Sequence, residues 1–464
     1  AYEGLNNAGA SREPLIVILN DNGMSITPNV GGIARHLGLI RTRPGYFRIK
    51  KAYRAVTNAL PGGKALYRMT HLLKERWKQM LLGSTLFEEM GFEYYGPVDG
   101  HDLKRLEYML RLVEDCKRPV LLHVITQKGK GYRPAELNPD VFHGIGCFDP
   151  SDGHTPQNAH LPGFSDTFGR VMCELADKEP RLCAISAAMI RGTGLAEFRK
   201  AYPARCFDVG IAEGHAVAMA GGLAKQGMLP VVAIYSTFLQ RAYDMILQDV
   251  SMLDLHVVFA VDRAGLVGED GETHHGLFDV NYLRSVPNMQ VLCPANQAEL
   301  ELMLRHAILE MKGPVAVRYP RGCDGAYTQA AASPILRAGR DITLVSYGTL
   351  INQVLRAAEL LEKQGISAEV LKLPSIKPID FSVIRTSVRK TGHLLVAEEA
   401  VCIGCAGKEI AGMLRTEGMN PVIRLCNAGD RFVPQGAVSD LYRLLGLDAE
   451  SLAKTALEVL DHEA

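Results

Sequence analysis

Residues 16–26 read Ile-Val-Ile-Leu-Asn-Asp-Asn-Gly-Met-Ser-Ile, an apolar run that ends in a polar turn. Such a β-branched run predicts a parallel strand, because parallel strands are usually apolar on both faces. In open α/β sheets, ligands bind beyond the carboxyl ends of the strands, which is where Asn22 falls. The Asn22 amide oxygen and the Met24 carbonyl are hard oxygen donors, which Mg²⁺ or Ca²⁺ prefers. The alternative is a plain turn, in which Asn is common.

The rest of the chain alternates between short apolar runs and helical patterns, which predicts parallel sheets covered by helices. We therefore expect an α/β protein with three successive doubly wound sheets, each parallel or mixed. The predicted strands are 16–19 and 119–126 in the first block, 182–185, 230–235, 255–261, 290–292 and 315–318 in the second, and 342–346, 368–372, 393–397 and 422–424 in the third.

Stretches rich in turn-forming residues separate these blocks. A chain of 464 residues has room for about three domains, each with its own core. The predicted organisation is a first domain at 1–150 with a basic insertion at 35–78, a linker at 151–163, a second domain at 164–323, a linker at 324–340 and a third domain at 341–464.

Charge gives little reason to expect a nucleic acid or a membrane as partner, since 51 basic residues balance 51 acidic ones. The basic stretch Arg35–Lys78 holds twelve Lys or Arg and one acid, Glu75. It could bind nucleic acid, but in a neutral chain a solvated helical insertion is the favoured interpretation. No apolar run reaches 18 residues, so we expect a soluble, cytoplasmic protein. A plastid location stays open, because a targeting segment could precede residue 1.

The ten cysteines are scattered singly except for Cys402 and Cys405. This spacing is typical of free thiols in a reducing compartment rather than of a disulfide framework. The Cys402-Ile-Gly-Cys405 stretch has thioredoxin-like spacing but no second pair that would complete a zinc site. We interpret it as a strand-to-helix turn with incidental cysteines.

In the second block, residues 208–216 read Asp-Val-Gly-Ile-Ala-Glu-Gly-His-Ala. They place Glu213 before a small-residue helix that we predict over 216–224. On one interpretation, Glu213 only stabilises the N-terminus of that helix by its charge. On the other, it is a shielded acid whose pKa is raised by burial and which exchanges a proton with a ligand.

Residues 235–244, Tyr-Ser-Thr-Phe-Leu-Gln-Arg-Ala-Tyr-Asp, follow the predicted strand 230–235. Phe238 could stack on a flat heterocycle and Arg241 could bind a phosphate. A core phenylalanine and a surface arginine at a helix start are the alternative. Arg321, which follows the predicted strand 315–318 in Arg-Tyr-Pro-Arg-Gly, is a second candidate phosphate ligand.

A polar, glycine-rich loop at 261–276 contains Asp270 and the adjacent pair His274 and His275. Catalytic groups often lie on such loops, and histidine transfers protons near neutral pH. Metal binding is less favoured, because adjacent histidines in an extended segment point in opposite directions. His143, in Val-Phe-His-Gly, carries no signal of its own.

Together these stretches resemble one family, the 1-deoxy-D-xylulose-5-phosphate synthases, which are transketolase-like thiamine diphosphate enzymes. The resemblance covers essentially the whole chain and is weakest across 35–78. The matching motifs are Tyr2-Glu-Gly-Leu-Asn-Asn-Ala-Gly, Leu19-Asn-Asp-Asn-Gly-Met-Ser-Ile, Gly96-Pro-Val-Asp-Gly-His-Asp, Ala233-Ile-Tyr-Ser-Thr-Phe-Leu-Gln-Arg-Ala-Tyr-Asp and Val317-Arg-Tyr-Pro-Arg-Gly.

The resemblance implies that pyruvate is joined to D-glyceraldehyde 3-phosphate with loss of CO₂, at the entry to the non-mevalonate route to isoprenoid precursors. It also implies thiamine diphosphate, Mg²⁺ and a homodimer, with residues 1–150 as the C-terminal part of the diphosphate- and metal-binding domain and 164–323 as the pyrimidine-binding domain. By position, the expected roles are Asn22 and Met24 as metal ligands, Glu213 as the acid at the pyrimidine nitrogen, Phe238 stacked on the pyrimidine, His143, His274 and Asp270 at the reacting centre, and Tyr235, Arg241, Arg263 and Arg321 on the acceptor.

Two departures from the family pattern matter for function. No Gly-Asp-Gly metal motif precedes Asn22, and a separate N-terminal fragment or subunit is one candidate to supply it. Gly214 stands beside Glu213 where the family usually has Gln. The alternatives are a non-catalytic or split subunit, and another transketolase-like enzyme such as a transketolase or a pyruvate dehydrogenase β subunit. Arg241 and Arg321 favour a phosphorylated acceptor over a lipoyl domain.

Overall fold

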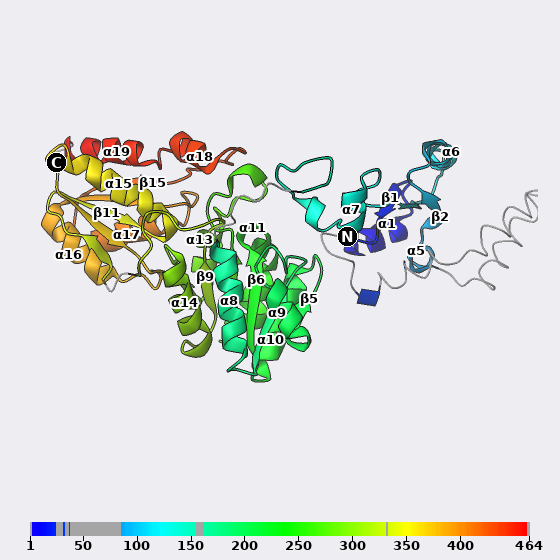
Figure 1. Cartoon of the computed structure of the whole chain (residues 1–464), viewed down its shortest axis with the longest axis horizontal. Coiled ribbons are helices and arrows are strands. Elements are labelled where there is room, and N and C mark those ends of the chain that lie inside the picture. Colours follow the sequence, from blue (N-terminus) through cyan, green and yellow to red (C-terminus); the bar gives the residue numbers. More distant parts are fainter. Residues whose placement is uncertain are drawn as a thin grey trace, which may run out of the picture. The chain divides into compact units, whose positions relative to one another are not determined.

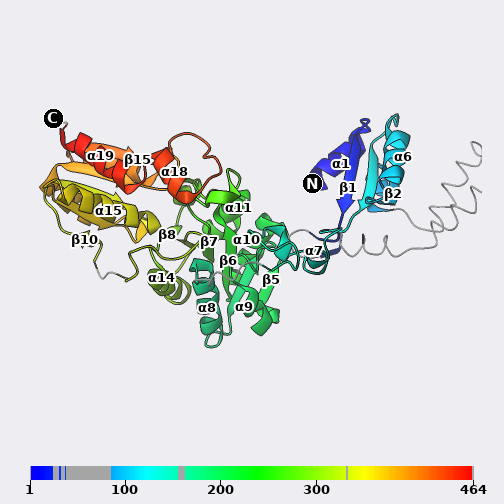
Figure 2. The same ribbon diagram turned by 45° about the horizontal axis from the view of Figure 1, so that its top comes forward.

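The described chain divides into a unit at Ala1–Gln157 and a second unit at Asn158–Ala464 (Figures 1 and 2). The structure is a computed structural model that describes residues 2–24, 31–32, 37, 85–154, 162–330 and 333–461. The predicted basic insertion at 35–78 lies outside the described residues apart from Leu37, and most of the predicted linker at 151–163 is also outside them.

The first unit contains a three-stranded parallel sheet in the order β1-β3-β2. Polar residues follow the strands at their carboxyl ends. The elements are α1 (Tyr2–Ser11), β1 (Ile16–Asp21), α5 (Leu86–Glu89), β2 (Glu93–Asp99), α6 (Leu103–Val113), β3 (Val120–Ile125), α7 (Arg133–Leu137) and the 3₁₀ turn η1 (Val141–His143).

Strand β1 forms where the sequence predicts it and extends two residues further, to Asp21. The expectation that it is buried on both faces is wrong for the described residues. Val17 and Leu19 pack against a core that contains Phe92 and Leu121, whereas Ile16 and Ile18 are 39% and 53% exposed. Successive side chains of a strand point to opposite faces, and the described residues cover only one face of β1.

Strand β2 contains the Gly96-Pro97 pair, joined by a cis peptide bond, and was not predicted as a strand. Proline cannot donate a hydrogen bond to a neighbouring strand and is confined to edges and bulges. The pairing of β2 with β3 accordingly shifts register between Tyr95 and Val98. A Cβ on Gly96 would lie 2.5 Å from the His123 carbonyl oxygen, so this close approach requires glycine.

The second unit contains a seven-stranded sheet in the order β13-β8-β9-β7-β6-β4-β5. All neighbouring strands are parallel except β13, which is antiparallel to β8. The strands are β4 (Leu182–Ser186), β5 (Cys206–Asp208), β6 (Leu229–Tyr235), β7 (Val258–Asp262), β8 (Gln290–Leu292), β9 (Val315–Arg318) and β13 (Ser375–Lys377).

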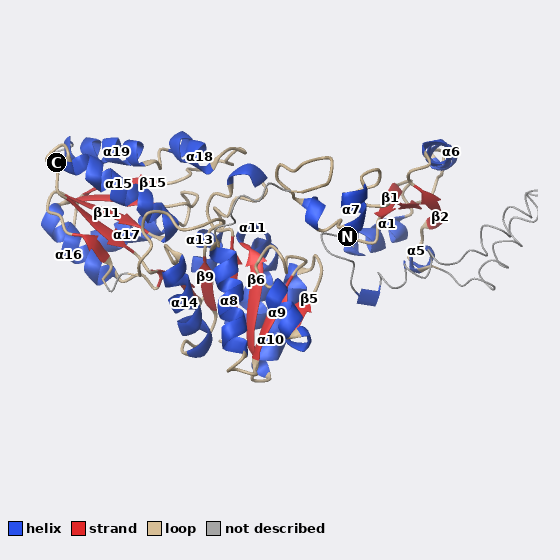
Figure 3. Cartoon of the chain, viewed as in Figure 1, coloured by secondary structure: helices blue, strands red, loops and turns tan. Residues whose placement is uncertain are grey.

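Helices bury both faces of this sheet (Figure 3). Val231 and Val258 point to a core formed with α8 (Phe164–Ala176) and α14 (Gln297–Leu309). Their neighbours Val232 and Phe259 point to the opposite core, formed with α10 (Glu213–Lys225) and α13 (Asp279–Ser285). The remaining helices of this part are α9 (Ala196–Ala201), η2 (Pro203–Arg205), α11 (Ser236–Leu239), η3 (Gln240–Ala242), α12 (Tyr243–Met245), the π-helix η4 (Ile246–Ser251) and η5 (Gly268–Asp270).

A five-stranded sheet follows in the order β10-β12-β11-β14-β15, with β10 antiparallel to β12. Helices α15 and α19 cover one face, and α16 and α17 cover the other. The elements are β10 (Ile335–Arg337), β11 (Ile342–Ser346), η6 (Gly348–Leu350), α15 (Ile351–Glu362), β12 (Ala368–Lys372), α16 (Phe381–Thr391), β14 (His393–Ala397), α17 (Ala406–Thr416), β15 (Val422–Cys426), α18 (Val438–Leu445) and α19 (Ala449–Asp461).

These two sheets belong to one packed unit. Strand β13 comes from the third block of the sequence yet completes the sheet of the second block. The largest core cluster contains Phe259 from the second block and Val396 from the third. Strand β10 lies within the stretch predicted as a linker at 324–340. The predicted α/β class with three parallel or mixed sheets is confirmed.

Candidate functional site

The turn after β1 is formed by side chains that accept hydrogen bonds from the backbone. Asn22 Oδ1 accepts from the Met24 amide at 2.9 Å, and Asp21 Oδ1 accepts from the Gly23 amide at 3.1 Å. The Asn22 amide oxygen has a second lone pair, so this bond does not exhaust it as a ligand. The predicted metal ligands Asn22 and Met24 therefore lie next to each other at the carboxyl end of β1, as expected for a ligand site.

Asp21, His123 and Tyr94 form a buried, hydrogen-bonded triad next to this turn, and His123 and Tyr94 were not among the residues expected from the sequence. Asp21 Oδ2 lies 3.0 Å from His123 Nε2, and His123 Nδ1 lies 2.7 Å from the Tyr94 hydroxyl. His123 is fully buried and Asp21 is nearly so. A carboxylate only accepts, so Nε2 carries the proton and Nδ1 accepts from Tyr94. The signal was present in the sequence as a polar histidine within the apolar strand β3.

His143, at the end of η1, pairs with a lysine that the sequence analysis did not consider. Lys128 Nζ lies 2.8 Å from His143 Nδ1. Burial lowers the pKa of His143, and the neighbouring Lys128 lowers it further. Since an ammonium only donates, Nδ1 is the acceptor and the proton of the neutral imidazole is on Nε2. His143 therefore presents an N–H donor on its other side.

In the second unit, Glu213 begins α10 and only 3% of its surface is exposed. Arg241 Nη1 donates to Glu213 Oε2 at 2.6 Å, while 57% of the Arg241 side chain remains exposed. Glu213 is therefore buried, as its interpretation as a shielded acid requires. Arg241, predicted to bind the acceptor, forms an ion pair with this acid.

Three aromatic rings lie side by side at the carboxyl end of β6. The rings of Tyr235 and Phe238 have centroids 5.9 Å apart and are inclined by 29°. The His274 ring meets the Phe238 ring edge-on, with centroids 5.3 Å apart. His275 turns away and is buried, which agrees with the expected opposite orientation of the two histidines. The Phe238 face is of the kind that stacks on a flat heterocycle.

Two of the predicted acceptor arginines share one carboxylate. Arg263 Nη1 and Arg321 Nη1 both donate to Asp270 Oδ2, at 2.8 and 3.0 Å. The Arg263 guanidinium also lies 4.0 Å from the centroid of the Tyr235 ring, in cation–π contact. Two guanidinium groups and one carboxylate leave one positive charge, which suits a phosphate monoester. Arg263 has a φ of 58°, a strained conformation that is frequent at functional sites.

Asp262, directly before Arg263, is a further polar residue that sequence reasoning missed. It ends β7, is fully buried and accepts a hydrogen bond from Ser165 Oγ at 2.7 Å. Its other oxygen, Oδ1, has no hydrogen-bond partner among the described residues. Burial raises the pKa of Asp262 to about 7. The signal available in the sequence was a carboxylate at the end of an apolar strand.

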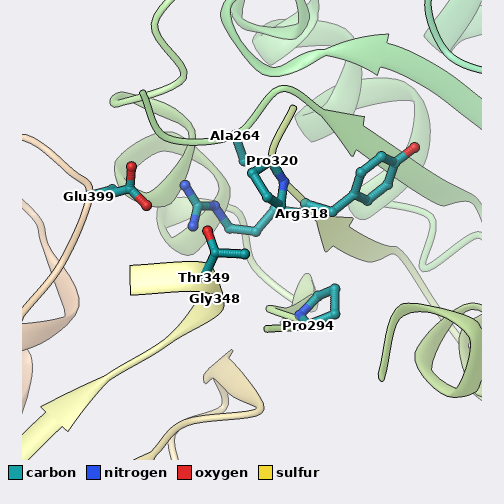
Figure 4. A pocket seen from close by; sticks show the side chains of 8 residues that line it. Ala264, Pro294, Arg318, Pro320, Gly348, Thr349 and Glu399 are labelled. Carbon is teal, nitrogen blue, oxygen red and sulfur yellow. The ribbon is translucent and has the colours of Figure 1, made fainter. Parts of the chain in front are cut away.

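A small cavity of about 10 Å³ lies near this site (Figure 4). It has room for about one water molecule, so it is too small for a substrate. Its most polar lining groups, Arg318 and Glu399, face each other across it in the figure. Arg318 also donates to Asp279, at 3.0 and 3.2 Å. The lining residues are Ala264, Pro294, Arg318, Tyr319, Pro320, Gly348, Thr349 and Glu399.

Comparison with known proteins identifies the family. Residues 1–126 match the family described as 1-deoxy-D-xylulose-5-phosphate synthase, residues 162–323 match the transketolase pyrimidine binding domain, and residues 331–452 match the transketolase C-terminal domain. The chain is 43% identical to the 1-deoxy-D-xylulose-5-phosphate synthase of Heliobacterium modesticaldum, over 99% of this chain and 72% of that protein. The synthase of Pelotomaculum thermopropionicum is 45% identical over 99% and 73%, respectively.

The chain belongs to the 1-deoxy-D-xylulose-5-phosphate synthase family. It is therefore a transketolase-type transferase of the thiamine diphosphate class. Among solved structures, a chain described as "Split gene transketolase, inactive beta4 tetramer" is 29% identical, with a TM-score of 0.59 over 66% of this chain and 100% of that one. Transketolase from Campylobacter jejuni has the same fold, with a TM-score of 0.55 at 18% identity over 98% of this chain and 74% of that one.

The described residues fit the parts of the family's cofactor. The turn at Asn22 and Met24 offers two oxygen donors to a metal that also binds a diphosphate, and Mg²⁺ is commonly held by few protein ligands together with phosphate oxygens. Within the described ranges, no three His, Cys, Asp or Glu side chains converge as a metal site of their own. In the second unit, Glu213 and Phe238 supply a buried acid and an aromatic face.

The structure also bears on the cysteines and on the question of membrane-spanning helices. All ten cysteines are free, and burial raises the pKa of Cys405 to about 12, which disfavours the thiolate that redox chemistry requires. Cys405 precedes α17, in line with the interpretation of the Cys402–Cys405 stretch as a turn before a helix. Among the described helices, none combines the length and the apolar character needed to cross a bilayer.

Proposed function

We propose that this synthase-family chain condenses pyruvate with D-glyceraldehyde 3-phosphate to 1-deoxy-D-xylulose 5-phosphate and CO₂, the first step of non-mevalonate isoprenoid precursor synthesis. The observation that carries the acceptor assignment is the Arg263–Asp270–Arg321 cluster, whose net positive charge lies beside Tyr235 and, through the stacked rings, beside Phe238 and His274. A phosphorylated aldehyde would place its phosphate on this cluster and its reacting carbon toward the rings.

Thiamine diphosphate, when bound, supplies the electron sink that a 2-oxo acid needs in order to lose CO₂. Glu213 is proposed to contact the pyrimidine nitrogen, because a carboxyl group with so little exposure is shielded from water. Phe238 would stack on the pyrimidine, while His274 and Asp270 would line the reacting centre. Arg241 would be shared between Glu213 and the acceptor side, since its guanidinium pairs with the acid yet stays more than half exposed.

In the first unit, Asn22 and Met24 are proposed to bind Mg²⁺ together with the diphosphate. His143 is proposed to donate from Nε2 to the reacting centre, since Lys128 occupies Nδ1. The exposed apolar side chains of β1, Ile16 and Ile18, support the further proposal that a segment outside the described residues packs on this sheet.

Three organisational features are also proposals. The domain division is that of the sequence analysis, at 1–150, 164–323 and 341–464, and it is supported by family matches at similar positions. A homodimer is proposed from family membership. A cytoplasmic location is supported by the ten free cysteines, which are typical of a reducing compartment.

The proposal is tested by measuring CO₂ release from pyruvate, with and without D-glyceraldehyde 3-phosphate. The chain is assayed alone and together with a Gly-Asp-Gly-bearing N-terminal fragment of a relative, in the presence of thiamine diphosphate and Mg²⁺. We expect acceptor-dependent release. Release that ignores the acceptor would indicate another thiamine enzyme, and no release from correctly folded protein under either condition would contradict the assignment.

Within that assay, Glu213→Ala should lower kcat by at least about a hundredfold, the usual scale of general acid–base catalysis. The matched control is Glu450→Ala, which removes a carboxylate from an exposed pair with Arg356. A Glu213→Ala variant that stays as active as this control would refute the role of Glu213.

A further inference from the structure

The loop at residues 263–277, between β7 and α13, carries Arg263, Asp270 and His274 but has little structure of its own. Its base is closed by two hydrogen bonds between Gly265 and Gly276, at 2.8 and 2.7 Å. Its remaining regular element is the 3₁₀ turn η5. Because most of the loop lies outside regular structure, contacts with the rest of the protein help to place its side chains.

The surroundings are provided by the third block of the sequence. Glu399, two residues after β14, is 8% exposed, and its Oε1 accepts a hydrogen bond from the Leu266 amide at 3.1 Å. A Cβ on Gly265 would lie 2.8 Å from the same oxygen, so the carboxyl group packs directly on the loop backbone. Gly265 has a φ of 79°, and glycine allows both this conformation and the close approach.

Groups on several elements surround the Glu399 carboxyl. Arg318 from β9 faces it across the small cavity (Figure 4), and the Tyr442 side chain from α18 forms a hydrogen bond with it. Burial raises the pKa of Glu399, and the Leu266 amide, Arg318 and Tyr442 partly offset that rise. The carboxyl is therefore fixed on more than one side, which makes it a rigid acceptor for the loop.

His275 makes a second bridge from the loop to the same block. Its Nδ1 accepts from the Val267 amide at 3.2 Å, and its Nε2 lies 3.1 Å from the Pro434 carbonyl oxygen. An amide only donates and a carbonyl only accepts, so Nε2 carries the proton. The imidazole thus joins the loop backbone to the backbone of the C-terminal segment.

Apolar contacts also join the loop to the C-terminal block. Leu266 and Leu277, near the two ends of the loop, are buried in a cluster with Val401, Val433 and Leu441. The Val401 amide also donates to the Leu277 carbonyl at 3.1 Å. The loop is therefore bound at both ends to residues 399–441, whereas Asp270 and His274 remain partly exposed between these attachments.

We propose that Glu399 and His275 are positioning residues through which the C-terminal block fixes the 263–277 loop, and with it the acceptor-binding Arg263 and its partner Asp270. The inference rests on the proposed function in one respect, the role of this loop in acceptor binding. It predicts that the C-terminal block influences the affinity for the phosphorylated acceptor more than the affinity for pyruvate.

Glu399→Ala, Glu399→Gln and the wild type are compared in the assembly that shows turnover. Glu399→Ala leaves the Leu266 amide buried without an acceptor, and we expect the KM for D-glyceraldehyde 3-phosphate to rise about tenfold. The KM for pyruvate should change by less than about twofold. A selective change in one KM is diagnostic, because a general loss of folded enzyme lowers apparent kcat and does not shift one KM alone. Glutamine retains an oxygen that can accept from Leu266, so Glu399→Gln should stay within about twofold of the wild type.

A second readout does not depend on activity. Hydrogen exchange of the backbone amides at 264–277 should be about tenfold faster in Glu399→Ala than in the wild type, with α15 and α19 unchanged. The matched control is Glu409→Ala, which removes another carboxylate of the same block, paired with Arg284 outside the loop. This control should leave both KM values and the exchange of the loop unchanged.

The outcomes separate the two proposals. A wild type without acceptor-dependent turnover contradicts the proposed function, while the exchange comparison still decides whether Glu399 orders the loop. Wild-type KM and exchange in Glu399→Ala would overturn the inference, and so would an equal defect in Glu399→Gln. If Glu399→Ala does not fold, His275→Ala is measured in its place, with the same expected effects and the same overturning result.

Discussion

At the residue scale, three buried carboxyl groups of the second unit differ in the partner that each one meets. Glu213 accepts a hydrogen bond from a guanidinium, Asp262 accepts one from a hydroxyl, and Glu399 accepts one from a backbone amide. Burial disfavours the charged form of a carboxylate, and it raises the pKa of both Asp262 and Glu399. Asp262 is the better probe of this effect, since its pKa of about 7 lies within an accessible pH range.

Asp262 should make the stability of the second unit depend on pH. Its pKa rises from 3.8 to about 7 on folding, so the folded state favours the protonated carboxyl. The contribution of Asp262 to the free energy of unfolding is therefore complete below pH 3.8 and is lost as the pH rises through 7. Asp262→Asn cannot ionise and lacks this loss. Relative to the wild type, its free energy of unfolding should therefore increase by about 2–3 kcal/mol between pH 5 and pH 8.

Urea unfolding at the two pH values measures this difference. Asp440→Asn, which changes an exposed carboxylate on α18, is the matched control and should show no comparable trend. A difference between Asp262→Asn and the wild type that is the same at pH 5 and pH 8 would contradict the assigned origin.

At the scale of the element, α10 places Glu213 because its small residues let it pack closely. A Cβ on Gly221 would lie 2.6 Å from the Asp249 carbonyl oxygen of η4, whereas a Cβ on Gly222 would meet nothing within 4 Å. At Gly214, beside the acid, a Cβ would lie 3.0 Å from the flexible end of Met245. The three glycines therefore serve different purposes within one helix.

Alanine substitutions should separate these purposes. Gly222→Ala should stabilise the protein by about 0.5–1 kcal/mol, since alanine is the better helix former. Gly221→Ala should destabilise it by about 1–3 kcal/mol, because backbone atoms of η4 cannot give way as a side chain can. Gly214→Ala should fall between them, close to neutral. Thermal unfolding checks this order, and a stabilised Gly221→Ala would show that the close approach of α10 to η4 is not required.

At the scale of the whole molecule, the described residues of the second unit share one core although two family domains match them. Strand β13 is built from the third block but extends the sheet of the second, and Arg284 of α13 pairs with Glu409 of α17. The 263–277 loop is a further connection between the two blocks. Separation of the blocks would expose apolar surface on both.

Fragment expression tests this shared core. Residues 158–464 should fold cooperatively as one unit, whereas residues 162–330 alone should aggregate or unfold without a sharp transition, because the face that packs on Val396 and its neighbours becomes exposed. Size-exclusion chromatography and circular dichroism during heating distinguish the two cases. A monomeric 162–330 fragment with a sharp unfolding transition would show that the second block has a sufficient core of its own.

Much of this architecture follows from local sequence. Strands β8, β9, β11, β12 and β14 have the predicted bounds, because an apolar run between turn-forming residues is a local signal. Strand β2 was missed because Gly96 and Pro97 interrupt its pattern, and the exposed face of β1 was missed because apolar composition does not reveal what covers it.

The sequence by itself determined the residue types of the site and much of their placement, since Asn22, Tyr235 and Arg263 end or follow predicted strands and Glu213 precedes a predicted helix. Only the tertiary structure decided which side chains meet. Arg241 pairs with Glu213, while Arg263 and Arg321 share Asp270. The reason is physical: periodicity records whether a side chain faces the core, whereas pairing between residues far apart in the chain depends on how the strands are ordered in the sheet and on which loops pack together.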